Sequence, residues 1–150
     1  MRKILSVTVL LCSVTSAHAE WTWGDTAAFA AGAVVPLIAH EAGHQLLGGK
    51  DIEWNGTEWR CTSDCNQSRI AGGGFVAEAV VGEAVARAFD EPRHRAFRLG
   101  VRASAGLHLL TYALRNDRDF ENFSKADRKK ARAIAAVAGL LNLIQIKGEF

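Results

Sequence analysis

The run VVPLIAHEAGHQLLGG, at residues 34–49, contains the pattern His-Glu-x-x-His at His40, Glu41 and His44. Residues four apart on an α-helix lie on one face, about one turn apart, so His40 and His44 can each direct an imidazole nitrogen at one metal ion. This spacing is typical of zinc sites, in which the intervening Glu41 acts as general base on a water molecule. The sequence therefore predicts a zinc site on a helix that ends near Gly48.

The motif has a second interpretation, an ordinary amphipathic helix with two surface histidines. Such a helix would carry polar residues beside the motif, whereas residues 34–39 are all apolar. Polar side chains in an apolar segment need a partner, and a metal ion provides one. We therefore favour the metal site.

The segment His40-Glu41-Ala42-Gly43-His44 resembles the active-site helix of the zincin metallopeptidases. The apolar residues before it, together with the later segment AGGGF at residues 71–75, more narrowly resemble the membrane-embedded site-2 protease group and its short relatives. The resemblance implies a zinc cofactor and a peptide or protein substrate. The site-2 group takes its third zinc ligand from an Asn-Pro-Asp-Gly-like segment, and this sequence contains no such segment.

A third protein ligand is predicted on a later helix. The segment 75–86 is apolar except for Glu78 and Glu83. A carboxylate in such surroundings is costly unless it is paired, protonated or bound to a metal. We expect Glu78 to be the ligand because Ala and Val flank it on both sides, with Glu83 as the fallback because it can pair with Arg87. The remaining candidates are Asp51, Asp64 and His108.

Two further polar residues, His108 and Tyr112, stand four apart in an apolar segment and so share one face of a helix. Metal-dependent peptidases need a donor directed at the oxyanion that develops during hydrolysis, and a His or a Tyr is suited to this. Both residues are therefore candidate catalytic residues beside Glu41. The alternative is that His108 is a core residue held by hydrogen bonds.

Residues 1–19 have the features of a secretory signal peptide: a basic start, an apolar core at residues 4–14, and a small-x-small cleavage site that ends at Ala19. We expect export and cleavage after Ala19. Residues 20–150 then form a single metalloprotease-like domain, because about 130 residues suffice for one modest core and leave no room for a second.

The charge and cysteine content of the mature chain follow from this cleavage. Loss of Arg2 and Lys3 lowers the number of Lys plus Arg from 18 to 16, which equals the 16 Asp plus Glu. A neutral chain is not typical of a nucleic-acid-binding protein. Cleavage also removes Cys12 and leaves Cys61 and Cys65, which in an exported protein predicts a disulfide. The alternative, a Cys-x-x-x-Cys metal half-site, lacks a second cysteine pair.

The composition predicts a mainly helical fold, because the chain has only 2 prolines and many alanines. We expect about four helices around the His-Glu-x-x-His helix, at residues 25–47, 75–89, 95–114 and 124–146. Asn55-Gly56 lies between two short runs that carry aromatic residues, which predicts a β-hairpin directly after the first helix. This hairpin either holds an extended substrate by main-chain pairing or is purely structural.

The longest uncharged run, residues 26–39, has 14 residues, fewer than the roughly 18 that mark a membrane-spanning helix. Basic residues gather at the start of the last predicted helix, where they suit solvent or lipid headgroups. We expect an exported protein of the inner membrane or the periplasm, and of these we favour association with the membrane.

The predicted function is zinc-dependent hydrolysis of peptide bonds, with Glu41 as general base and His108 or Tyr112 at the oxyanion. The alternative is a non-catalytic metal-binding or structural protein of the cell envelope, in which the site only holds helices together. A third interpretation is a small membrane protein whose motif is fortuitous and binds no zinc.

Overall fold

The computed structural model describes residues 21–48, 52–54, 56, 59–62, 67–115 and 123–147. The predicted signal peptide, residues 1–19, lies outside these residues. So do Cys65 and the side chain of Cys61, and with them the predicted disulfide.

The described part of the chain is mainly helical, which confirms the predicted helical class. The elements in chain order are α2 (Trp23–Gly48), β1 (Ile52–Trp54), β2 (Trp59–Cys61), α3 (Gln67–Ala88), the short 3-10 helix η2 (Pro92–His94), α4 (Arg95–Leu114) and α5 (Lys125–Lys147). The two strands pair antiparallel, with Trp54 opposite Trp59. Gly56 lies between them with a φ of 98°, a left-handed conformation that favours glycine.

Helix α2 begins earlier than the predicted start at residue 25, because Thr22 caps it. The hydroxyl of Thr22 accepts a hydrogen bond from the backbone N–H of Asp25 at 3.1 Å. The Asp25 carboxylate accepts in return from the Thr22 hydroxyl at 2.6 Å and from the Thr22 N–H at 2.8 Å. Ser124 and Asp127 cap α5 by the same pattern.

Helix α3 also begins earlier than predicted, since the glycines at 72–74 lie inside it and not before it. The reason is the close approach of α3 to α2. A Cβ atom on Gly43 of α2 would lie only 2.3 Å from the carbonyl oxygen of Gly73. Glycine lowers helix propensity, but here it permits contact between two helix backbones that no other residue allows.

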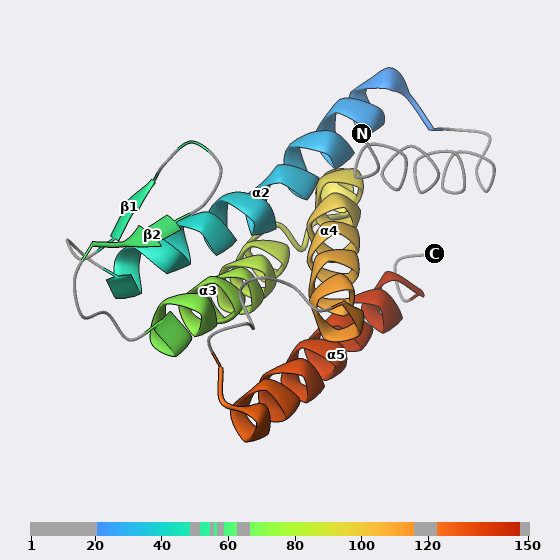
Figure 1. Cartoon of the computed structure of the whole chain (residues 1–150). Coiled ribbons are helices and arrows are strands. Elements are labelled where there is room, and N and C mark those ends of the chain that lie inside the picture. The colour runs from blue at the N-terminus through green and yellow to red at the C-terminus, as the bar shows by residue number, and fades with distance from the viewer. Residues whose placement is uncertain are drawn as a thin grey trace.

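Helix α4 lies between α2 and α5 (Figure 1) and supplies most of the core, including Leu99, Val101 and Leu109. Glycine again allows the close crossings. A Cβ on Gly100 of α4 would lie 2.0 Å from the carbonyl oxygen of Phe29 on α2, and a Cβ on Gly139 of α5 would lie 2.9 Å from that of Gly106.

Beside their apolar core, the described helices bury several polar side chains and expose several large apolar ones. Buried polar residues include His40, Glu78, Arg102 and Asn142. Arg102 of α4 donates hydrogen bonds to Glu83 of α3 at 2.9 Å and to Gln145 of α5, so it joins three helices. The large apolar side chains that are exposed lie mainly on α2, α3 and α5; examples are Ile38, Val76, Val80, Ile134, Val137 and Ile144. Helix α2 alone, over Trp23–Leu46, is long and apolar enough to cross a membrane.

We expect Gly100→Ala to lower the free energy of unfolding by about 1–3 kcal/mol or more, because its Cβ would collide with the α2 backbone. Gly72→Ala is the matched control, since a Cβ there would meet no atom within 4 Å. It should raise stability by about 0.5–1 kcal/mol through helix propensity. Thermal unfolding of both variants by circular dichroism tests this, and equal stability of the two would contradict the close α2–α4 crossing.

Candidate metal centre

His40 and His44 lie one turn apart in α2 and turn their rings toward each other. Their Nε2 atoms are 3.0 Å apart, and both side chains are buried. The rings meet edge to face, with centroids 4.6 Å apart. The helix spacing therefore brings the two nitrogens to one point, as the motif predicts.

The other ring nitrogen of each histidine is engaged elsewhere. His44 Nδ1 lies 3.0 Å from the carbonyl oxygen of Ile70 on α3. A carbonyl oxygen can only accept, so this nitrogen carries the hydrogen and donates it. His40 Nδ1 lies 3.0 Å from Glu78 Oε2 and donates to the carboxylate. In a neutral imidazole whose Nδ1 is protonated, Nε2 carries the lone pair. Two lone pairs thus face each other at 3.0 Å, which is unfavourable unless a proton or a metal ion lies between them.

The spacing of the two nitrogens fits a metal ion. Two nitrogens at roughly 2.05 Å from a tetrahedral zinc ion are about 3.3 Å apart, close to the 3.0 Å found here. Imidazole nitrogen is a preferred zinc donor, and a hydrogen bond from the opposite ring nitrogen is typical of metal-binding histidines. The two histidines therefore fit two of the four ligand positions of a zinc ion.

Gly74 of α3 forms the floor of this site. A Cβ atom there would lie 2.7 Å from His44 Cε1, 2.8 Å from His44 Nε2 and 3.0 Å from His40 Cε1. The absence of a side chain at Gly74 is thus what leaves room for both imidazoles against α3.

Glu78 lies on the far side of His40, with no exposed side-chain area. Besides the hydrogen bond from His40, its carboxylate accepts from His108 Nδ1 of α4, at 2.9 Å to Oε2 and 3.0 Å to Oε1. One ligand atom from each of His40, Glu78 and His108 lies within 4.8 Å of the others, so these residues can also hold a metal ion. His40 therefore belongs to two possible donor sets, one at each of its ring nitrogens.

Tyr112 of α4 packs against both His40 and His108. Its ring stacks on the His40 ring, with centroids 5.2 Å apart and an interplanar angle of 15°. Its hydroxyl lies 3.3 Å from His40 Nε2. Phe75 of α3 packs its edge against both rings. The hydroxyl is therefore beside the point where the two histidine nitrogens meet.

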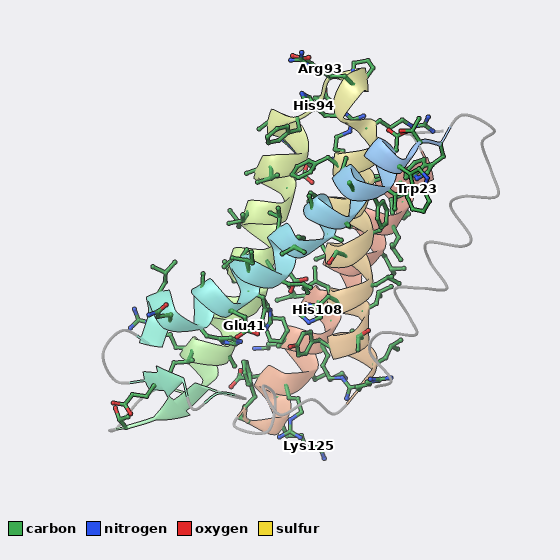
Figure 2. The ribbon with its side chains drawn as sticks, turned by 90° about the horizontal axis from the view of Figure 1, so that it is seen from above. Trp23, Glu41, Arg93, His94, His108 and Lys125 are labelled. Carbon is green, nitrogen blue, oxygen red and sulfur yellow. The ribbon has the colours of Figure 1, made fainter. Side chains whose placement is uncertain are left out.

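Glu41 follows His40 in α2, and its side chain is exposed. Figure 2 shows Glu41 and His108 between the end of the structure that carries Arg93 and the opposite end, which carries Lys125. Glu83, the fallback ligand, lies elsewhere: it accepts from Arg87 at 2.6 Å and from Arg102 at 2.9 Å. The remaining candidates Asp51 and Asp64 lie outside the described residues.

Without the fallback Glu83, the sequence singles out six catalytic or metal-binding residues. The structure brings five of them into contact: His40, His44, Glu78, His108 and Tyr112. The sequence did not indicate the roles of Ile70 and Phe75. Ile70 acts through its backbone carbonyl, which leaves no trace in the side-chain pattern. The glycines at 72–74 predicted the start of a helix. They lie instead inside α3, where Gly73 and Gly74 pack closely against α2.

No protein-family model, no curated protein and no solved structure matches this chain. The function of the site is therefore inferred from its geometry.

We expect Gly74→Ala to weaken zinc binding at least about tenfold, the lower end of the loss that follows when the support of a metal ligand is disturbed. The added methyl group would displace the two imidazoles. Isothermal titration of the metal-free mature chain with Zn²⁺ measures the effect, and Gly72→Ala is the control on the same helix. Equal affinity in the two variants would contradict a metal at the paired Nε2 atoms.

Proposed function

We propose that this protein is a zinc-dependent hydrolase of peptide bonds. The observation that carries the proposal is that the Nε2 atoms of His40 and His44 lie 3.0 Å apart. Glu41, which follows His40 in the same helix, is exposed. Two histidines four apart with a glutamate after the first are the arrangement that metal-dependent peptidases use. Bound zinc would supply Lewis acidity, which lowers the pKa of a water molecule and polarises a carbonyl group.

The residues of the chain divide the remaining work. His40 and His44 would hold the metal through Nε2. Glu41 would take a proton from the attacking water and return it to the leaving amine. The side chain of Glu41 is exposed and so can meet water and substrate.

Tyr112 is the better of the two candidates for stabilising the oxyanion. Its hydroxyl lies 3.3 Å from His40 Nε2, the atom that would hold the metal, so it would be close enough to donate to an oxyanion that forms there. The Nδ1 atom of His108 instead faces the carboxylate of Glu78, and the His108 ring packs against that of Tyr112, with centroids 4.7 Å apart. We therefore assign the oxyanion to Tyr112 and not to His108.

We also propose that the protein is exported and lies in the membrane. Support comes from the outer faces of α2, α3 and α5, which are uncharged over much of their length. No charged residue occurs between Arg132 and Lys147, and the exposed side chains there include Ile134, Val137 and Ile144. Exposed apolar surfaces of this extent mark contact with a membrane or a partner. Because these faces belong to three helices packed around or beside α4, a surrounding bilayer covers them more completely than a single partner would.

Glu41→Gln tests the enzymatic proposal. We expect the variant to keep one zinc per chain and its fold, and to lose about 10²–10⁴-fold in kcat on a peptide substrate, because the amide cannot accept the proton. Zinc is measured by elemental analysis of protein purified without chelator and offered zinc. Cleavage is measured on a fluorogenic peptide library.

Three results would distinguish the alternatives. Zinc in the wild type and its loss in His44→Ala, without any cleavage, would favour a structural metal site. Retention of activity in Glu41→Gln would remove Glu41 as the base. No zinc in the wild type would mean that a shared proton, and not a metal, joins the two Nε2 atoms, and the hydrolase proposal would fail.

Val137→Lys tests the location. We expect the full chain, expressed in bacterial cells, to stay in the membrane fraction after an alkaline carbonate wash. A lysine at this apolar position should cost about 2.5–3.5 kcal/mol in a membrane and shift part of the protein to the soluble fraction. Ala126→Lys, in the charged first turn of α5, is the control. Release of the wild type by the wash would contradict the proposal.

A further inference from the structure

We infer that Glu78 is a positioning residue, which holds His40 and His108 from a place outside the metal's ligand sphere. The inference rests on the proposed metal-dependent function and names a role for the one buried carboxylate of the site. It differs from the expectation drawn from the sequence, in which Glu78 was the third zinc ligand.

The carboxylate of Glu78 is shared between two imidazoles. Oε2 lies 3.0 Å from His40 Nδ1 and 2.9 Å from His108 Nδ1, and Oε1 lies 3.0 Å from His108 Nδ1. Both contacts are made to Nδ1, and both have hydrogen-bond length. Two N–H donors satisfy an ionised carboxylate that has no exposed area, so this arrangement does not itself require a metal ion.

The two nitrogens of the His40 ring face different partners. Nδ1 faces Glu78 and Nε2 faces His44. The lone-pair directions of Nδ1 and Nε2 diverge across the imidazole ring. An ion at about 2.1 Å from both Nε2 atoms is therefore beyond the coordination distance of a carboxylate that is bonded to Nδ1. Glu78 and His44 thus cannot both bind the same ion while these hydrogen bonds persist.

The Nε2 side is the better metal position of the two. At the Nδ1 side, donors and acceptors already match, since each N–H has an oxygen. At the Nε2 side, two acceptor nitrogens face each other, and a cation removes their repulsion. Gly74 leaves room for these two rings, and Glu41 belongs to the same helix turn.

Glu78 accordingly sets the orientation and the tautomer of His40. A carboxylate that accepts from Nδ1 keeps the lone pair on Nε2 and raises its basicity toward a metal. The same carboxylate also holds His108. Its bond to His108 joins α3 to α4, and its bond to His40 joins α3 to α2. His40, Glu78 and His108 come from three different helices, so removal of the carboxylate would release two rings at once.

The test is a titration of the metal-free mature chain with Co²⁺, whose visible absorption reports the number and kind of ligands. We expect Glu78→Gln to keep one ion per chain with unchanged band positions and to bind about 10–100-fold more weakly. Glu83→Gln is the matched control, because Glu83 lies on the same helix and pairs only with arginines in the contacts described above. It should bind as tightly as the wild type.

Two results would overturn the inference. Shifted bands in Glu78→Gln, with an otherwise intact circular dichroism spectrum, would make Glu78 a ligand. Loss of the ion in His108→Ala together with its retention in His44→Ala would place the metal at Nδ1 of His40.

The tautomer of His40 provides a test that needs no metal and no variant. Long-range ¹H–¹⁵N spectra of the metal-free wild type should show hydrogen on Nδ1 of both His40 and His108. Hydrogen on Nε2 of His40 would overturn the role of Glu78. If the wild type binds no metal but shows the expected tautomers, the hydrolase proposal fails and the hydrogen-bonding role of Glu78 stands.

Discussion

The close contact of helix backbones at glycine is the constraint on which the structure depends. Gly43 against Gly73, Gly100 against Phe29, and Gly139 against Gly106 each bring two helices closer than any side chain would allow. The helices are long but rich in alanine and glycine, so little side-chain volume separates them. Short distances between helices are also what let imidazole and carboxylate groups from α2, α3 and α4 reach each other across the interior.

The polar centre is a continuous series of hydrogen-bonded groups. It runs from the carbonyl of Ile70 through His44 and His40 to Glu78 and His108. Every contact has hydrogen-bond length, but only the one between the two Nε2 atoms joins two acceptors. This single mismatch distinguishes the centre from an ordinary buried polar network, in which every donor meets an acceptor.

The distribution of polarity is the second unusual feature of the described residues. Charged and polar groups lie inside, as with Glu78 and Arg102, whereas valines and isoleucines lie outside on α2, α3 and α5. Arg102 donates through Nη1 to Glu83 and Gln145, whereas its buried Nε has no hydrogen-bond partner among the described residues. Charged residues such as Arg93 and Lys125 lie toward opposite ends of the helices (Figure 2).

The sequence by itself determined the elements and the motif. Many alanines and only two prolines predicted a mainly helical chain. The observed bounds of α4 agree with the predicted residues 95–114, because Pro92 and η2 come directly before it and a charged segment of sequence follows it. The spacing of His40 and His44 was sufficient to place both on one face, since that depends only on helix geometry. The buried acid at Glu78 could also be recognised, because an isolated carboxylate in an apolar helix requires a partner.

Only the tertiary structure decided what those partners are. The register of α3 against α2 decides which nitrogen of His40 Glu78 meets, the one that faces His44 or the opposite one. Close contacts at Gly73 and Gly74 set this register, and local helix propensity does not. The same register brings the Ile70 carbonyl to His44. The crossing of α4 brings both Tyr112 and His108 against His40, the first with its hydroxyl near Nε2 and the second with its Nδ1 on Glu78. These are distances between helices far apart in the chain. These distances arise from the packing of the helices. The sequence pattern along one helix determines only which of its residues lie on the same face.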